Sequence, residues 1–565
     1  MTDDYTIATE TRHILDDVIL RDKRLYHPET VAEAAKKISF HSSIGLNEPY
    51  VPTPCKLTES SAALYATLGA YASAISAERY DLPLQDIMVN TDRATLASMS
   101  ILLTQIAGKS VSEAPDYIRK LITEGDRGRR SIRYRQLATN IYKTKDGKFF
   151  HLHGSMNADK TLLMLGLPAD RADLQLSDRE EIVDLFDREC QKYDAEWLDI
   201  TANEKYGQAG TVCYTPEEYQ KTEHGKAMAN EALWTIGKVD KHLSPISWPT
   251  SQDENMRPLV GIRVVDISRV IAAPTMSRIL ASLGATVIHI SNNLEPDMTN
   301  ILIESNLGKY DMQINLKTSE GKKQMENIIA DADVVIDGYR PGCMDRLGFG
   351  PDTVHQVAKR RDKGVIYVRE NCYGWKGPWT HRSGWQQISD CVTGVSWLQG
   401  KFLGLDEPVV PLLPNTDYQT GIIGAIAVMN ALNRRAHEGG SYNVDVSLNQ
   451  FNTWYISLGQ YTDEQSKKIM SMHPNLKLRY TDEIMSLTRK TLTTMLQATP
   501  QLFSLQNMES INSPKWDPRG NEKNIPVTYL KAVVEFNKTK LHYDVGSCPP
   551  ASYESELAWK VTYTH

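Results

Sequence analysis

The stretch from residue 258 to 291, PLVGIRVVDISRVIAAPTMSRILASLGATVIHIS, constrains the fold more than any other part of the chain. GIRVVDIS has the pattern of a short buried strand, PTMSRILASLGA has apolar residues at helical spacing, and TVIHI is a second strand. Strand, helix and strand in this order indicate a right-handed parallel crossover. We therefore predict an α/β fold with a parallel sheet, to which DADVVIDGY and GVIYVREN add further strands.

Length and composition narrow the class of protein. A chain of 565 residues predicts two or more domains, because single cores rarely exceed about 300 residues. The net charge of −7 gives no sign of a nucleic acid or an anionic membrane as partner. The N-terminus MTDDYTIATE does not resemble a signal peptide, and the longest apolar run, IIGAIAVMNAL, is about half the roughly 20 residues that a membrane span needs. The seven cysteines form no CxxC pair, so we expect no metal site and a cytoplasmic location.

The two halves of the chain share a weak internal repeat. TESSAALYATLGAYASAISAER predicts a helix with an acidic start at Glu59, and the strand-like LQDIMVNT follows it. The same order occurs later, where a helix from Asp417 to Arg435 precedes SYNVDVSLNQ.

Between the two copies of this repeat, IYKTKDGKFFHLHG predicts a hairpin with Asp-Gly at its turn. The polar, proline-rich stretch 242–258 marks the main domain boundary.

Asp417 stands at the start of a long and nearly uncharged segment, PNTDYQTGIIGAIAVMNAL. One interpretation is that Thr416 or Asp417 caps the helix by accepting backbone N–H bonds. The other is that the same helix N-terminus holds a working carboxylate. Local sequence alone favours the cap.

Two further stretches carry candidate binding residues. Arg340 and Arg346 flank a Pro-Gly turn after a strand, where their guanidinium groups suit phosphate, although two surface arginines would look the same. The aromatic loop 371–394 contains His381, a possible acid–base group that is more often simply solvated. Its three tryptophans could stack on a ligand or pack in the core: Trp375, Trp379 and Trp385. The chain has no G-x-G-x-x-G after its first strand, and no G-x-S-x-G elbow, Walker loop or H-E-x-x-H motif.

Three stretches, in order, resemble the class III coenzyme A transferases, the CaiB/BaiF family, which includes formyl-CoA transferase and α-methylacyl-CoA racemase. They are PLVGIRVVDISRVIAAPTMSRILASLGATVIHI, ADVVIDGYRPGCMDRLGFG and YGWKGPWTHRSGWQQISDCVTG. The resemblance implies a Rossmann-like large domain, a smaller α+β domain and an interlocked architecture. It also implies acyl-CoA and a small carboxylic acid as substrates, with no permanently bound cofactor.

The resemblance assigns roles to individual residues. Asp417 falls on the family's nucleophilic aspartate, which forms an aspartyl-CoA thioester during CoA transfer. The family's CoA contacts fall on Ile271, Ala272, Lys317, Gly338, Tyr339, Arg340 and Arg346.

This chain also departs from the family pattern. Asn292 stands where an arginine is common, and Trp385 stands where the racemases have an acid–base histidine. The glycine-rich loop that covers the site in several transferases is not recognisable. The chain resembles two copies fused tail to head, the first without its sheet and the second without its small domain. We therefore expect a homodimer or a single-chain pseudo-dimer, with Glu59 as a relic rather than a second site.

The predicted domains follow from this reading. They are a helical partial repeat of the large domain (1–135), a small α+β domain (136–245), a Rossmann-like CoA-binding domain (246–460) and a helical and closing segment (461–565). The leading functional prediction is a CoA-transferase that uses Asp417 as nucleophile. The alternatives are an α-methylacyl-CoA racemase or epimerase and a non-catalytic homologue that binds acyl-CoA.

Overall fold

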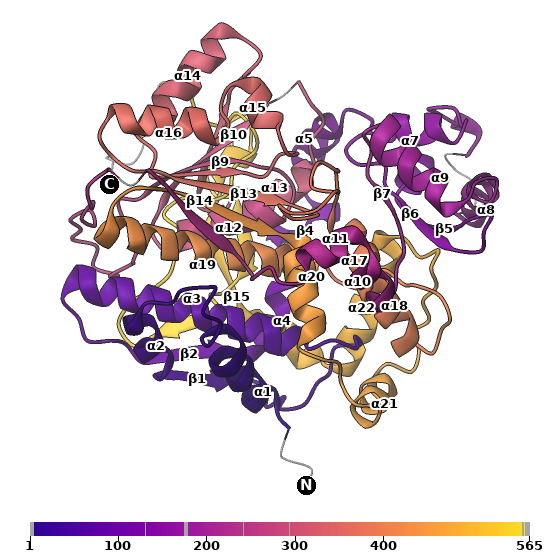
Figure 1. The fold of residues 1–565 in the computed structure, drawn as a ribbon, viewed down its shortest axis with the longest axis horizontal. Helices are drawn as coiled ribbons and strands as arrows, with labels where there is room; N and C mark the ends of the chain where they lie inside the picture. Colours follow the sequence, from indigo (N-terminus) through magenta and orange to yellow (C-terminus); the bar gives the residue numbers. More distant parts are fainter. Residues whose placement is uncertain are drawn as a thin grey trace.

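The centre of the molecule is a seven-stranded sheet in the order β11–β10–β9–β12–β13–β14–β8 (Figure 1). This computed structural model describes residues 5–129, 132–174, 179–240, 242–292, 294–555 and 559. All neighbouring strands run parallel except β8, which is antiparallel to β14 at the edge. In sheet order the strands are Lys309–Gln313, Thr286–Ser291, Arg263–Ile267, Val334–Asp337, Ile366–Asn371, Ser441–Ser447 and Thr235–Asp240.

The α/β fold with a parallel sheet, predicted from the sequence, is confirmed. The patterns in GIRVVDIS, TVIHI, DADVVIDGY and GVIYVREN correspond to β9, β10, β12 and β13. The sequence did not reveal β11, whose core KYDMQ mixes charge and apolar residues because its polar side chains are buried in a network described below. Strand β8 lies inside the range predicted for the small domain, yet it pairs with the large sheet.

Helices cover both faces of this sheet. On one face lie α12 (Ala272–Ser282) and α19 (Asn415–Glu438), and on the other lie α14 (Ser319–Ala330) and α16 (Pro351–Arg360) (Figure 1). The alternation of strand side chains produces these two cores. Val264, Val334 and Ile366 join the core of α12 and α19, whereas their neighbours in sequence join the core of α14 and α16.

A smaller sheet repeats the geometry of three strands of the large one. Strand β1 (Ile38–His41) is parallel to β2 (Ile87–Asn90), and β17 (Val534–Phe536) is antiparallel to β2. Strands β13, β14 and β8 have the same relation. The prediction that the first copy lacks a sheet is therefore wrong. Its sheet was not visible locally because β1 is short and β17 comes from the far end of the chain.

The helices of the repeat match as well. Helix α3 (Leu57–Tyr80) and α19 each have 24 residues, and the two pack against each other. Each carries its acidic residue at the third position, Glu59 in one and Asp417 in the other. The predicted helix-then-strand repeat is confirmed, and α19 extends three residues beyond Arg435.

A small unit at one side of the large sheet contains the predicted hairpin (Figure 1). Its antiparallel sheet has the order β5–β6–β7, with bounds Asn140–Lys143, Phe149–Leu152 and Gly210–Val212. Asp146 and Gly147 lie in the turn between β5 and β6, and Gly147 has a φ of +75°. Three helices pack on this sheet: α7 (Asp159–Met164), α8 (Arg179–Cys190) and α9 (Ala195–Ile200).

The C-terminal segment returns to the N-terminal part of the chain. Strand β16 (Pro526–Leu530) pairs with β3 (Gln105–Ile106) and with β15 (Met508–Asn512), and β4 (Lys109–Ser110) completes that sheet.

The other α-helices are α1 (Ile7–His13), α2 (Glu29–Ala35), α4 (Thr91–Ala97), α5 (Asp116–Asp126), α6 (Arg133–Gln136), α10 (Pro216–Lys221), α11 (Glu223–Met228), α13 (Thr299–Ser305), α15 (Cys343–Leu347), α17 (Gln386–Thr393), α18 (Val395–Phe402), α20 (Leu448–Ser457), α21 (Asp463–Met472) and α22 (Ile484–Ala498).

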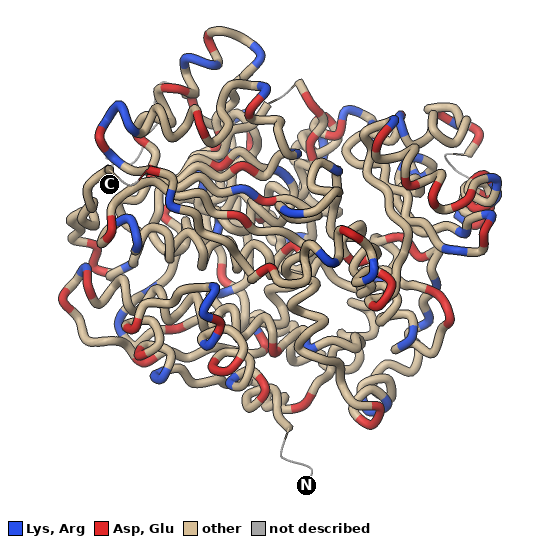
Figure 2. The backbone as a smooth tube through the Cα atoms, in the orientation of Figure 1, with Lys and Arg blue, Asp and Glu red and all other residues tan. Residues whose placement is uncertain are grey.

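Basic and acidic residues are mixed along the outer elements (Figure 2). Within the described ranges, no helix is both long enough and apolar enough to cross a membrane.

Candidate active site

A cavity of about 740 Å³ opens at the carboxyl ends of the parallel strands. The segments that follow these strands line it: 269–272 after β9, 294–296 after β10, 338–346 after β12 and 370–372 at the end of β13. Residues 155–157 and Lys160 of the small unit also line the cavity, and so does Asp417. This edge is where open α/β sheets bind their ligands.

Asp417 does not cap its helix. Helix α19 begins at Asn415, its N-cap residue is Pro414, and no side chain caps it by a hydrogen bond. The Thr416 hydroxyl instead donates to Asp390 at 2.8 Å. The capping interpretation of Thr416 and Asp417 is therefore wrong, because the proline turn starts the helix two residues earlier than the sequence suggested.

The glycine at position 421 helps to place Asp417. One turn after Asp417, a Cβ at Gly421 would lie 2.7 Å from the backbone oxygen of Ala272, so only glycine allows α12 to approach α19 this closely. Asp417 is on the same stripe of the helix and thus lies beside the start of α12. Ala272 and Asp417 both line the cavity.

The carboxylate of Asp417 is left without a hydrogen-bond donor among the described residues, although its backbone N–H donates to the Gln386 side chain. The side chain is only partly exposed, and it faces the cavity. Burial, together with the charge of Asp390, raises the pKa of Asp417 to about 8. Burial also raises the pKa of Asp390, to about 6, while Asn452 and Thr416 donate to it.

Glu370 is a second carboxyl group in the cavity, and sequence reasoning missed it. It lies at the end of β13, and no described residue forms a hydrogen bond or ion pair with its carboxylate. Burial and then the charges of Asp417 and Asp337 raise the pKa of Glu370 to about 8. A glutamate that ends an otherwise apolar parallel strand, as in GVIYVREN, is the signal that could have found it.

Five basic side chains line the cavity without an ion-pair partner among the described residues. They are Arg127, Lys160, Arg269, Arg340 and Arg346. Two more are paired: Arg129 with Asp159 at 2.9 Å, and Arg382 with Asp199 and Glu204, both at 3.0 Å. Unpaired cations at the mouth of a cavity attract an anionic ligand, and arginine binds phosphate through two parallel bonds. The sequence indicated only Arg340 and Arg346, because the others belong to loops that tertiary folding brings to the cavity.

Six of the seven predicted CoA contacts line the cavity: Ile271, Ala272, Gly338, Tyr339, Arg340 and Arg346. Lys317 does not. Its exposed side chain forms an ion pair with Glu295 at 3.1 Å, and Glu295 is on the cavity wall. Gly338 also has a packing role, because a Cβ there would lie 2.7 Å from Ser268.

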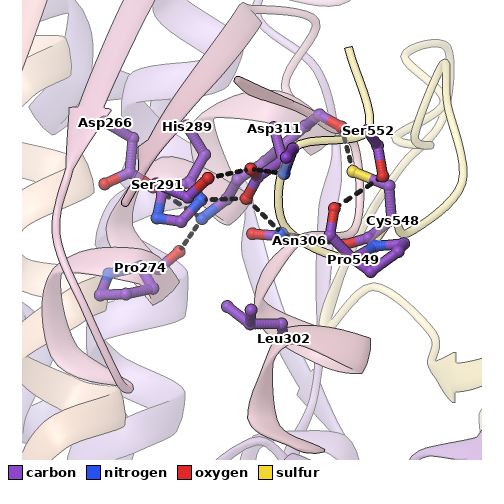
Figure 3. Close-up of polar contacts among 12 residues, drawn as sticks. Asp266, Pro274, His289, Ser291, Leu302, Asn306, Asp311, Cys548, Pro549 and Ser552 are labelled. Carbon is purple, nitrogen blue, oxygen red and sulfur yellow. Dashed lines mark hydrogen bonds and ion pairs between the residues drawn. The ribbon is translucent and has the colours of Figure 1, made fainter. Parts of the chain in front are cut away.

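A buried polar network lies under the loop that follows β9 (Figure 3). Lys309 donates to Asp266 at 2.8 Å and to the carbonyl oxygen of Pro274 at 2.9 Å. His289 bonds Asp311 at 2.6 Å through one ring nitrogen and the carbonyl oxygen of Ser268 at 3.1 Å through the other. Although burial lowers it, the Asp311 carboxylate raises the pKa of His289 to about 9.

This network fixes a strained loop. Val270 has a φ of +74°, a conformation that β-branched residues rarely adopt. The loop is held on both sides, because buried charged groups bond the carbonyl oxygens of Ser268 and Pro274. Such strain persists only where the surroundings impose it. Ile271 and Ala272 are thereby presented to the cavity.

The tryptophans of the aromatic loop divide into two groups. Trp385 lines the cavity, stacks on His153 at 5.1 Å between ring centroids, and donates to Ser155. Trp375 packs beneath the guanidinium of Arg369, and Trp379 stacks on His224, so these two serve the core. His381 is outside the cavity lining and bonds Glu204 at 2.9 Å.

Glu59, the counterpart of Asp417, is fully buried and is not part of the wall of the cavity that contains Asp417. The hydroxyl groups of Tyr5 and Tyr461 donate to its two oxygens at 2.7 and 2.8 Å. Its carboxylate is thus satisfied by protein groups. Within the described part of the chain, no cluster of His, Cys, Asp or Glu side chains could hold a metal ion.

Comparison with known proteins agrees with this arrangement. Residues 259–477 match the model of CoA-transferase family III. The chain is 38% identical over 504 residues to the acetyl-coenzyme A transferase nodX of Hypoxylon pulicicidum, an alignment that covers 87% of this chain and 84% of that protein. The chain belongs to CoA-transferase family III. The resemblance found in the sequence is confirmed.

Other relatives in the CoA-transferase family extend the comparison. An acyl-CoA transferase of Gibberella moniliformis is 34% identical over 426 residues, which is 74% of this chain and 73% of that protein. A solved structure of a CaiB/BaiF family protein from Brucella suis is 18% identical and has a TM-score of 0.37, covering 54% of this chain and 98% of that chain. The family match begins at residue 259, so the N-terminal units that supply Arg127 and Lys160 lie outside it.

Proposed function

We propose that this protein transfers coenzyme A from an acyl-CoA donor to a carboxylic acid, with Asp417 as the covalent nucleophile. One observation carries the proposal: an unbonded carboxylate faces a cavity whose wall also holds unpaired cations. Membership of CoA-transferase family III supports the same reaction class. The interpretation of the protein as a non-catalytic homologue gives no reason for a carboxylate that faces the cavity without a hydrogen-bond donor among the described residues.

Coenzyme A fits the charges of the cavity. Its phosphates would meet the unpaired cations Arg340 and Arg346 beside the Pro-Gly turn, and Arg127, Lys160 and Arg269 would complete the basic wall. Backbone groups of Ile271, Ala272 and Gly338 would bind the pantetheine arm. Lys317 would act only from the rim, through Glu295. No permanently bound cofactor is needed for this chemistry.

The proposed reaction begins when a carboxylate oxygen of Asp417 attacks the thioester carbon. The carbon–sulfur bond breaks, which leaves a mixed anhydride and releases the sulfur of CoA. The sulfur then attacks the side-chain carbonyl carbon of Asp417, releasing the first acid and leaving an aspartyl-CoA thioester. A second carboxylate repeats the sequence in reverse, takes the CoA and restores the Asp417 carboxylate.

Burial of Asp417 favours this role. A carboxylate that is poorly solvated is a stronger nucleophile, and its raised pKa of about 8 reports that poor solvation. The first turn of α19 places the positive end of the helix dipole next to the developing charge.

The repeat of α3 and α19 supports a single-chain pseudo-dimer, in which the α3 half substitutes for a second subunit. A homodimer of these chains is the alternative. Sedimentation equilibrium of the purified protein distinguishes the two, because the pseudo-dimer predicts the mass of one chain.

The experiment that tests the proposed function is intact-mass spectrometry of the protein with a panel of acyl-CoA thioesters. Acetyl-CoA is the first to try, given the name of the Hypoxylon pulicicidum relative. We expect a CoA-sized adduct that hydroxylamine removes and that the Asp417→Asn variant does not form. Deuterium entering the α-carbon of the acyl group without any adduct would instead establish the racemase. CoA binding with neither result would leave a non-catalytic homologue.

A further inference from the structure

We propose that Glu370 is a second catalytic carboxyl group, which carries the proton that the CoA sulfur gains and loses during the transfer. This inference rests on the proposed function, because it concerns the thiol formed when Asp417 is acylated.

The position of Glu370 follows from the period of its strand. Ile366 and Val368 point from β13 into the core of α12 and α19. Glu370 is two residues further along and thus projects from the same face. That face meets α19, whose first turn carries Asp417, and both carboxyl groups line one cavity. Glu370 and Asp417 therefore lie on the wall of the same cavity, Glu370 on β13 and Asp417 on α19.

The Glu370 carboxylate forms no hydrogen bond or ion pair with a described residue that would give it a structural role. Its neighbour Arg369 is engaged with Asp445 at 2.7 Å and with the ring of Trp375. No described cation or hydrogen-bond donor neutralises Glu370 itself. Buried carboxyl groups are normally paired, and one left unpaired at the wall of a reaction cavity calls for a functional reason.

The functional reason is that the two carboxyl groups share one proton. Two ionised carboxylates in a poorly solvated site repel each other, so the pair holds one proton. In the form of the pair that reacts, Asp417 is the anion and Glu370 keeps the proton. When Asp417 attacks and the carbon–sulfur bond breaks, the proton passes from the Glu370 oxygen to the CoA sulfur. The products are a neutral anhydride, a neutral thiol and the Glu370 carboxylate.

The next step returns the proton. The Glu370 carboxylate takes it from the thiol as the sulfur attacks the Asp417 carbonyl carbon, and the released acid becomes the anion. The cavity thus carries one negative charge at every stage. Proton exchange is efficient because the pKa of Glu370, about 8, is close to the value of about 8.5 for a thiol.

Three other titratable groups face Glu370. Asp417 on α19 and Asp337 at the end of β12 both raise its pKa, and the Cys372 thiol lies two residues along the chain. Burial, with Glu370 and Asp390 nearby, keeps the Cys372 thiol protonated well above its ordinary pKa. The pKa values of Asp417 and Asp337 are also raised, to about 8 and about 6, but Asp417 is the nucleophile and Asp337 is not part of the cavity lining. Glu370 is therefore the group that we assign to proton exchange.

The test compares Glu370→Gln, Glu370→Asp and the control Glu326→Gln, which removes an exposed glutamate of α14. The glutamine keeps the shape and the hydrogen bonding but cannot donate and recover a proton. We expect turnover to fall roughly 100-fold or more in Glu370→Gln, to be partly restored in Glu370→Asp and to be unchanged in the control. Circular dichroism and CoA binding verify that each variant is folded.

Solvent deuterium and pH supply readouts that a structural role would not move. The rate of adduct formation in wild type should slow about two-fold or more in deuterium oxide, and Glu370→Gln should lose both this isotope effect and the pH dependence of that step. Equal rates, isotope effects and pH profiles in wild type and Glu370→Gln would overturn the inference. A wild-type protein that never forms an adduct would instead refute the proposed function.

Discussion

The two helices that carry Glu59 and Asp417 share a length, an acidic third position and a strand that follows, yet of the two acids Asp417 lines a cavity and Glu59 is fully buried. Around Glu59, two tyrosine hydroxyls satisfy the carboxylate, and the side chain is fully buried. Around Asp417, no described residue donates to the carboxylate, and the cavity wall supplies cations that form no ion pair with a described residue. The comparison teaches that the repeated fold provides the position of an acid, while the side chains around it decide whether the acid can react.

The largest expected effect is on turnover. Asp417→Asn should lower CoA transfer by at least about a thousand-fold, because the nucleophile itself is removed. Glu59→Gln should keep turnover within a few-fold of wild type, since its carboxylate contacts only protein groups. Steady-state rates of the two variants, made side by side, measure the contrast. Equal losses of turnover in the two variants would contradict the distinction between Asp417 as the catalytic acid and Glu59 as a relic.

The cations of the cavity form the second contrast. We expect Arg340→Met with Arg346→Met to weaken CoA binding at least about 100-fold, because hydrogen bonds between charged groups contribute about 1.5 to 3 kcal/mol each. Lys322→Met, on the exposed face of α14, should have no effect. Titration calorimetry with free CoA at two salt concentrations checks both values. Unchanged affinity in the arginine variant would place the phosphates elsewhere.

The network beneath the β9 loop should make stability depend on pH. The pKa of His289 rises to about 9 in the folded protein from an ordinary value near 6.5. Its contribution is therefore fully present below pH 6.5 and is lost as the pH rises through 9. The loss is on the order of a few kcal/mol, and urea unfolding between pH 6.5 and 9.5 measures it. His289→Gln should flatten this dependence, whereas the exposed control His437→Gln should not.

The two acids should also show opposite changes in stability. The pKa of Asp417 is raised in the folded state, so its contribution favours folding at low pH and declines as the pH rises from about 4 to about 8. Asp417→Asn should therefore be more stable than wild type at pH 8.5 and nearly equal to it at pH 4. Glu59→Gln should be less stable by about 1 kcal/mol, because one tyrosine hydroxyl loses its charged acceptor. Thermal unfolding of the variants at both pH values tests the signs.

The sequence predicted what depends on local pattern. The strands around GIRVVDIS and DADVVIDGY, the long helix after Asp417 and the Asp-Gly hairpin all follow from residues close together in the chain. Six of the seven predicted CoA contacts line the cavity for the same reason, because they sit at the ends of recognisable strands.

What the sequence missed depends on contacts between distant segments. Strand β17 joins β2 across more than 400 residues, and β11 is polar because the buried network around Lys309 satisfies it. Arg127 and Lys160 reach the cavity only through tertiary packing. The helix start was misplaced by two residues because Pro414, rather than a side-chain cap, begins α19.

The most direct test of the central claim is peptide mapping of the protein after reaction with a labelling acyl-CoA and hydroxylamine. The peptides that contain Asp417, Glu59 and Glu370 can be compared in one sample, so each acid serves as a control for the others. The account predicts a hydroxamate on Asp417 and none on the other two. A hydroxamate on Glu59 or Glu370, with Asp417 unmodified, would contradict it.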